Sequence, residues 1–164
     1  MRWKRKSNGG MALQNRFAVM LLGWCSALVL ATLCIGCKPR VSSYEVGRTT
    51  SPNGRLEAIL TETNGGGTTS FGYEVSIGTK GASNAQRVAS LYGAVRNAQA
   101  YGVNLSWTDN HTLRIQYLRA KAVQNVISTV NVNGQQVEVT LQSDIEDPNA
   151  PAGGMQYNLQ KQSH

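Results

Sequence analysis

The stretch Val103-Asn-Leu-Ser-Trp-Thr-Asp-Asn-His-Thr-Leu-Arg-Ile-Gln-Tyr117 decides the fold class of this 164-residue chain. Apolar residues alternate with polar ones on both sides of a polar centre, with Leu105 and Trp107 before it and Leu113 after it. This alternation is the period-2 pattern of a half-buried β-strand. Because residues 108–111 have turn composition, the stretch predicts a β-hairpin.

The same pattern recurs on both sides of this hairpin. Further strands are predicted over residues 56–63, 71–77, 87–92, 127–132 and 135–141. Asn133-Gly134 joins the last two, and Asn-Gly is a strong signal for a two-residue hairpin turn. Five to seven short strands without strong intervening helices predict an all-β fold, a small antiparallel β-sandwich or open barrel.

The N-terminal segment has a different composition. Residues 17–36 carry no charge, and the cations that precede them are Arg2, Lys4, Arg5, Lys6 and Arg16. A positive n-region, an apolar h-region and a small residue at the cut are typical of a secretory signal peptide. Residues 1–36 are therefore predicted to be a signal or anchor helix that precedes the β-fold.

The end of this run, Leu33-Cys34-Ile35-Gly36-Cys37, resembles the lipobox of bacterial lipoproteins. It departs from the pattern at Cys34, where leucine is usual. The resemblance implies cleavage between Gly36 and Cys37, and attachment of diacylglyceryl and acyl groups such as palmitate to Cys37. A cysteine suits this step because its thiolate is the nucleophile. Several acyl chains also hold a protein to a membrane far longer than one.

Two alternatives stay open. About twenty apolar residues are needed to span a bilayer, so residues 17–36 could form an uncleaved helix in a single-pass membrane protein. Met11 could also be the true start, which would leave a leader of ordinary length. The lipid anchor and the uncleaved helix both place residues 38 onward outside the cytoplasm. Lys38 follows the cysteine, and the retention signal of diderm bacteria resembles Asp there. The resemblance thus implies the outer membrane in a diderm and the outer face of the cell membrane in a monoderm.

Charge and cysteine content limit what the remaining chain can do. The formal net charge is +7, but five of the 16 Lys and Arg precede Cys37 and all nine acids follow it. The part after Cys37 therefore has 11 basic and nine acidic residues, a net charge of +2. It lacks the basic clusters with interleaved aromatics that bind nucleic acid. All three cysteines lie at or before Cys37, so this part has no disulfide, no zinc–thiolate site and no cysteine nucleophile.

Four segments follow from these patterns. Residues 1–36 are the signal peptide, residues 37–50 the lipidated cysteine and a polar tether, and residues 51–145 the β-domain. Residues 146–164 lose all periodicity and are rich in Pro, Gly, Gln and Asn. That composition predicts a disordered tail.

Three short motifs resemble a group of small bacterial proteins of unassigned activity. They are Ser51-Pro52-Asn53-Gly54-Arg55, Gly66-Gly67-Thr68-Thr69 and Val75-Ser76-Ile77, similar to S-P-D-G-K, G-G-x-T-T and V-S-I. A later W…L-x-I-x-Y hairpin matches Trp107, Leu113, Ile115 and Tyr117. The likeness covers about half of the part after Cys37, and it implies a fold class and no function.

Several residues have chemistry worth weighing against an ordinary structural role. The glycine-rich loop 65–70 could present N–H groups to an anion, but it lacks the lysine and helix of a phosphate-binding loop. Asp109 and His111 could form a general base, yet the segment that contains them has the composition of an ordinary turn. Asp144, Glu146 and Asp147 lack the spacing of a calcium loop. In each case the ordinary loop is the favoured interpretation.

The strands add two further sets of candidates. Single carboxylates on different strands could meet in a site: Glu57, Glu62, Glu74 and Glu138. Aromatic residues could stack on a sugar or a peptide: Tyr73, Tyr92, Trp107 and Tyr117. Outward charges and inward aromatics are, however, what a half-exposed sheet shows anyway.

We therefore expect a lipid-anchored protein of the bacterial cell envelope with a binding or structural β-domain. Its expected partners are membrane lipid through Cys37 and an unidentified envelope protein or ligand. No catalytic, cofactor-binding or metal-binding residue is assigned, and no cofactor is expected. The alternative is a small envelope hydrolase that uses carboxylates, which requires two or more acids to converge in a pocket.

Overall fold

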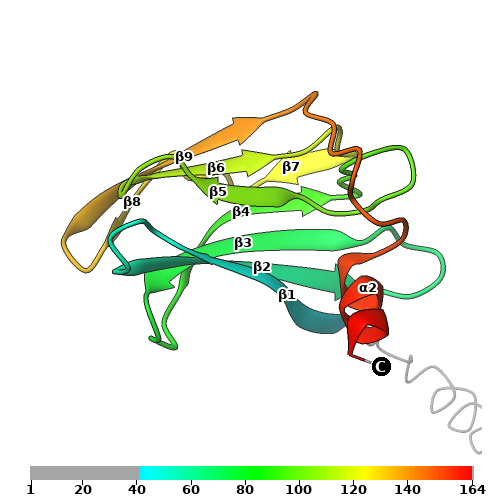
Figure 1. Cartoon of the computed structure of the whole chain (residues 1–164), viewed down its shortest axis with the longest axis horizontal. Coiled ribbons are helices and arrows are strands. Elements are labelled where there is room, and N and C mark those ends of the chain that lie inside the picture. Colours follow the sequence, from blue (N-terminus) through cyan, green and yellow to red (C-terminus); the bar gives the residue numbers. More distant parts are fainter. Residues whose placement is uncertain (1–40, 164) are drawn as a thin grey trace, which may run out of the picture. The chain divides into compact units, whose positions relative to one another are not determined.

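The computed structural model describes residues 41–163, which form two β-sheets and one short helix (Figure 1). The five-stranded sheet has the order β1-β2-β3-β4-β7, with β1 at Ser42–Thr50, β2 at Leu56–Asn64, β3 at Gly72–Thr79, β4 at Gln86–Tyr92 and β7 at Ala122–Gln124. The four-stranded sheet has the order β5-β6-β9-β8, with β5 at Asn104–Trp107, β6 at Thr112–Gln116, β9 at Gln135–Gln142 and β8 at Thr129–Val132. The helix α2 covers Met155–Gln162.

The two sheets enclose one hydrophobic core, which confirms the predicted all-β sandwich. In the longer strands of the core, alternate residues face inward, as in Leu56, Ala58 and Leu60 of β2. Leu113 and Ile115 of β6 do the same from the other sheet. The fractional burial thus follows the period-2 pattern of the sequence.

The sandwich differs from the prediction in two details. It has nine strands in the described residues, where five to seven were predicted. The sheets are not purely antiparallel, because β6 and β9 pair in parallel. After β6 the chain joins the five-stranded sheet as β7 and returns to the four-stranded sheet as β8. β9 then lies beside β6 and runs in the same direction.

Both predicted hairpins are confirmed. In β5–β6, Trp107 lies opposite Leu113 across the antiparallel pair. In β8–β9, the turn residues Asn133 and Gly134 have φ angles of 50° and 80°. Two consecutive left-handed residues are what a type I′ turn requires, and Asn-Gly tolerates them best.

The tether predicted over residues 37–50 is shorter, because residues 42–50 form β1. This strand lies at the edge of its sheet and contains an irregularity between Glu45 and Gly47, at Val46. An edge strand with a bulge has a weak alternation pattern. The sequence-based boundary of the β-domain at residue 51 was therefore too late.

The tail predicted to be disordered over residues 146–164 is instead attached to the sandwich. Asn97 donates from its side-chain amide to the carbonyl oxygens of Asp147 and Ala150, at 2.9 Å each. The Gly153 amide donates to Gln99 O at 2.9 Å, and α2 follows. The segment is held by backbone hydrogen bonds more than by apolar burial, and hydrophobic periodicity does not detect such bonds.

The segment after β9 crosses from one sheet to the other at one end of the sandwich (Figure 1). Its first part is bonded near β6, since the Ile145 amide donates to Tyr117 O at 3.2 Å. Its last part reaches β2, where the Met155 amide meets Glu62. In residues 41–163 no helix is long and apolar enough to cross a membrane. The predicted signal or anchor helix, Gly36 and Cys37 lie outside the described residues.

Candidate binding site

The strand carboxylates are in four separate environments. Glu74 pairs with Arg87 across the outer face of the five-stranded sheet, with 2.6 Å between Oε1 and Nη1. Glu138 is exposed on β9, whereas Glu57 and Glu62 have different partners, described below. Among the described residues no group of three His, Cys, Asp or Glu could hold a metal ion. These acids therefore do not form the converging pair that a carboxylate hydrolase requires.

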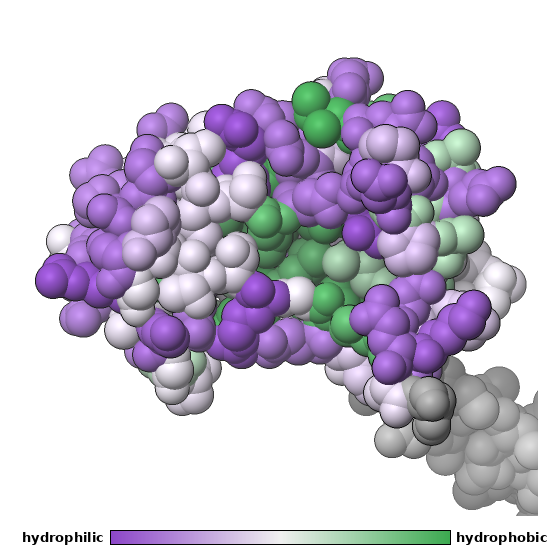
Figure 2. All heavy atoms as spheres, viewed as in Figure 1, coloured by the Kyte–Doolittle hydropathy of each residue, from purple (hydrophilic) through white to green (hydrophobic). Residues whose placement is uncertain are grey.

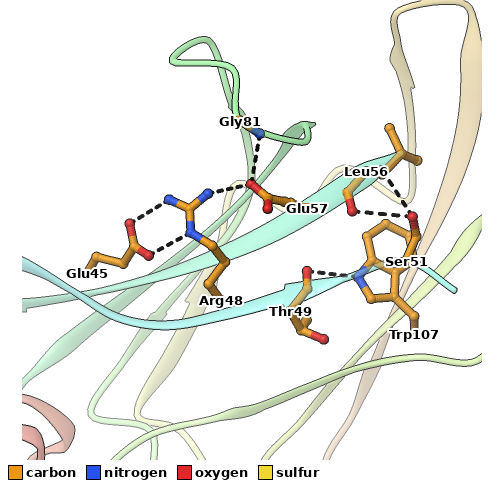
Figure 3. Close-up of polar contacts among 8 residues, drawn as sticks. All are labelled: Glu45, Arg48, Thr49, Ser51, Leu56, Glu57, Gly81 and Trp107. Carbon is orange, nitrogen blue, oxygen red and sulfur yellow. Dashed lines mark hydrogen bonds and ion pairs between the residues drawn. The ribbon is translucent and has the colours of Figure 1, made fainter. Parts of the chain in front are cut away.

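Glu57 takes part in an ion-pair network that fixes the edge strand β1 (Figure 3). Arg48 of β1 donates to both carboxylate oxygens of Glu45 at 2.8 Å and, through Nη1, to Glu57 of β2. Gly81, in the turn after β3, donates its amide to the same Glu57 oxygen at 3.2 Å. The Gly81 amide and then the Arg48 guanidinium hold the pKa of Glu57 below its usual range. The network links three segments and is a structural device.

Glu62 is a buried carboxylate on the inner face of β2, with 2% of its surface exposed. Its Oε2 accepts the Tyr73 hydroxyl at 2.8 Å and the Met155 amide at 2.7 Å. Met155 is the first residue of α2, so the carboxylate lies at the positive end of the helix. Burial, and then the hydrogen bond to Glu62, raise the pKa of Tyr73. Glu62 thus connects the core to the C-terminal helix.

The inward position of Glu62 was detectable in the sequence. It follows Leu56, Ala58 and Leu60 at the same two-residue spacing, so alternation places it on the buried face of β2. A carboxylate at such a position requires hydrogen-bond donors. Its partner on the neighbouring strand is Tyr73, directly opposite in the register. The helix amide could not be anticipated, because residues 146–164 were expected to be disordered.

The acidic and histidine-containing loops have ordinary turn geometry. Asp109 Oδ1 accepts the backbone amide of His111 at 2.7 Å, so the pair closes a turn and forms no acid–base contact. The backbone amide of His111, and then the side-chain hydroxyl of Thr112, lowers the pKa of Asp109. Asp147 Oδ2 accepts the Asn104 side-chain amide at 2.9 Å, and Asp144 accepts the Ser143 hydroxyl. These acids face different partners, which gives calcium no shared site.

The glycine-rich loop 65–70 is hydrogen-bonded to Tyr92, the last residue of β4. The Ser70 amide donates to the Tyr92 hydroxyl oxygen at 2.9 Å. Lys121 donates from Nζ to Ser70 Oγ at 2.6 Å, and the same ammonium lies 6.0 Å from the centre of the Tyr92 ring. The Ser70 amide is the main cause of a lowered pKa at Tyr92. Some of the donors that this loop could have presented to an anion are thus used within the chain.

The four aromatic candidates divide between the core and the surface. Tyr73 is fully buried, and Tyr117 is partly buried against the core. Tyr92 is exposed beside Lys121. Trp107 is half-buried, and its indole Nε1 donates to Thr49 O at 3.2 Å (Figure 3). Trp107 therefore joins β5 to β1, one edge strand of each sheet.

Beyond this contact a cleft of about 310 Å³ opens between the two edge strands. The residues that line this edge cleft are Gly47, Arg48, Thr49, Leu60, Val103, Asn104, Leu105, Asp147 and Met155. Figure 2 shows apolar side chains at the bottom of a hollow between the layers, with polar residues around it. The edge cleft was not predicted, because one of its walls is β1.

The edge cleft combines apolar residues with polar and charged ones. Its floor is apolar, with Leu60, Val103 and Leu105, and its two charged side chains are both engaged: Arg48 by Glu45 and Glu57, and Asp147 by Asn104. Comparison with protein-family models, curated proteins and solved structures finds no match to this chain.

Proposed function

We propose that this chain is a lipid-anchored protein of the bacterial cell envelope, and that its β-sandwich is a binding or structural module. One observation carries the proposal: a charge-free run, residues 17–36, follows five cations and ends at Gly36-Cys37. That order of features suits export followed by modification of the cysteine. The proposed attachment site is the sulfur of Cys37.

The position of β1 determines how far the sandwich can extend from such an anchor. β1 begins at Ser42, so residues 38–41 are the whole connection from Cys37. Four extended residues span at most about 14 Å. A lipidated Cys37 would therefore hold the domain close to the membrane surface, within reach of ligands or proteins at that surface.

The geometry supports a binding or structural role over the hydrolase alternative. The carboxylates that such an enzyme would need are separately engaged or exposed in the described part of the chain. The edge cleft, in contrast, is a concave space between two edge strands, lined by the partly exposed Leu105 and by polar residues. A cleft of a few hundred Å³ is a common place for a ligand to bind.

The proposal is tested by membrane attachment in a bacterial host. The full chain is expressed, and cleavage of its leader is compared with that of Cys37→Ser by the apparent mass of the membrane-extracted proteins. We expect the wild type to lose its leader and the variant to keep it, because cleavage follows lipidation. Cys34→Ser is the matched control and should behave as the wild type. Equal cleavage of wild type and Cys37→Ser would contradict the proposal.

A further inference from the structure

The sandwich has two ends with different surfaces. At one end the strand pairing places four strand termini side by side: Ser42, Asn64, Gly72 and Tyr92. The helix α2 lies at the same end, because the Met155 amide binds Glu62 near the end of β2 (Figure 1). We call this the α2 end. The opposite end consists of the turns at residues 51–55, 80–85, 108–111 and 133–134.

The exposed tyrosines of the described chain gather at the α2 end. They are Tyr44, Tyr92, Tyr101 and Tyr157. Tyr44 is opposite Glu62 in the register of β1 and β2. The ring of Tyr101 packs edge-on against Phe71, the residue before β3, with 5.1 Å between the ring centres. Tyr157 belongs to α2.

Exposed aliphatic side chains lie at the same end: Val41, Ile145 and Leu159. Val41 directly precedes β1, and Leu159 belongs to α2. The turns of the opposite end contribute none of the exposed large apolar or aromatic residues within 41–163. The two that remain, Val123 and Val126, lie on β7 and just after it. Exposed apolar surface is therefore concentrated at the α2 end.

We propose that the α2 end rests on the surface of the lipid bilayer, with its tyrosines in the headgroup layer. This contact rests on the membrane anchor proposed at Cys37. Residues 38–41 span at most about 14 Å, and they lead to Ser42, which lies at the α2 end. The nine residues of β2 extend for about 30 Å, so the tether brings the α2 end, and not the opposite turns, to the bilayer.

The chemistry of the α2 end suits that position. Tyrosine combines an apolar ring with a polar hydroxyl, and it is enriched where a protein meets the membrane–water interface. The charged residues outside the core at this end are balanced, three basic and three acidic: Arg119, Lys121, Lys161, Asp144, Glu146 and Asp147. The contact therefore does not need anionic lipid, and phosphatidylcholine is a sufficient probe.

Fluorescence quenching identifies the end that touches lipid. The full chain is extracted from membranes and placed in phosphatidylcholine vesicles, in which part of the lipid carries a nitroxide on its headgroup. Tyr157→Trp puts a probe at the α2 end, and His111→Trp puts one at an exposed position of the opposite end. Relative to the wild type, we expect at least threefold more added quenching in Tyr157→Trp than in His111→Trp, because a nitroxide quenches an indole only at short range. Equal quenching of both, or of neither, would overturn the proposal.

The wild-type chain separates this proposal from the anchor on which it rests. After cleavage before Cys37, its remaining tryptophan is Trp107, beside the turn 108–111 of the opposite end. Little quenching is then expected. A retained leader would keep Trp24 and add the same quenching to every variant. A quenched wild type would thus contradict cleavage, while the difference between the two probes would still show which end touches the bilayer.

Removal of exposed apolar side chains tests whether the surface itself makes the contact. Tyr44→Ser and Ile145→Ser are combined in the Tyr157→Trp chain, and we expect quenching to fall at least twofold. Val126→Ser is the matched control, since Val126 and Tyr44 are 48% and 47% exposed and Val126 lies beside the middle of β4. It should leave the quenching unchanged. If the double substitution behaves like this control, the tether alone keeps the α2 end near the bilayer and the proposal is wrong.

Discussion

Glu62 is an acidic residue whose side chain lies in the hydrophobic core. Its carboxylate is bonded to the Tyr73 hydroxyl and to the first amide of α2. Each such charge-assisted bond contributes about 1.5–3 kcal/mol to stability. The residue therefore acts as a fixed point between the five-stranded sheet and the C-terminal helix.

Glu62→Gln keeps the size of the side chain and removes its charge. We expect the free energy of unfolding to fall by about 2 kcal/mol, because a neutral amide oxygen is a weaker acceptor for two donors. The measurement is a urea titration followed by fluorescence. Glu138→Gln, on an exposed position of β9, is the control and should change the value by less than about 0.5 kcal/mol. Equal effects of the two substitutions would contradict this role.

Acid should weaken the network around Arg48. Arg48 lowers the folded-state pKa of Glu45. The Gly81 amide, and then Arg48, lower the folded-state pKa of Glu57. A lowered pKa means that the stabilisation is complete above the usual glutamate value of about 4.3 and is lost as the pH falls below it. The melting temperature should therefore drop less between pH 6 and pH 3 in Glu57→Gln than in the wild type. Parallel curves would show that the network does not contribute.

Trp107 joins the edge strands β5 and β1 and should contribute both packing and a hydrogen bond. A buried Trp→Ala substitution costs about 3–5 kcal/mol. Because Trp107 is half-buried, we expect about 2–3 kcal/mol for Trp107→Ala in a denaturant melt. Trp107→Phe keeps an aromatic ring but loses the bond to Thr49 and part of the packing, so it should cost about 1–2 kcal/mol. A loss below about 0.5 kcal/mol in both would mean that the edge strands are held together elsewhere.

At the scale of elements, sequence patterning identified strands that have one buried face and a defined turn. The β5–β6 and β8–β9 hairpins have both signals, and both are present. β1 is followed by a defined turn at residues 51–55, but it lacks a clear buried face, since it lies at a sheet edge and is bulged at Val46. The C-terminal segment was missed for another reason: its order comes from hydrogen bonds to the 96–100 loop and to Glu62, which no local pattern encodes.

Removal of residues 148–164 distinguishes a disordered tail from a segment that is attached to the sandwich. A disordered tail would leave the melting temperature almost unchanged. The structure instead predicts a fall of about 5–10 °C, because Glu62 and Asn97 each lose one of their two hydrogen-bond partners and the apolar side chain of Met155 is removed. Thermal melting of the full chain and the truncated chain gives the answer. An unchanged temperature would show that the attachment contributes nothing.

At the scale of the whole molecule, the fold class followed from the sequence, but the candidate sites did not. A small cavity beside α2 brings together residues near positions 46, 96 and 151–162, which no spacing rule connects. The edge cleft depends on two sheets that meet through strands far apart in the chain. Carboxylates and glycine-rich loops are visible in a sequence, whereas contacts between such distant segments are visible only in three dimensions.

The anchor and the sandwich combine into one account. A leader that ends at Cys37 would deliver and hold the chain, and four residues would connect it to β1. The part after Cys37 has a net charge of only +2, so the acyl chains rather than attraction to anionic lipid would hold it at the membrane. Lipid attachment at Cys37 is thus the claim on which the rest of the functional account depends.

The intact mass of the membrane-extracted protein tests that claim most directly. The account predicts the mass of residues 37–164 plus diacylglyceryl and acyl groups, and loss of those groups in Cys37→Ser. An unmodified mass that includes residues 17–36, unchanged by the substitution, would contradict it and would indicate that this segment is retained as a membrane-spanning helix.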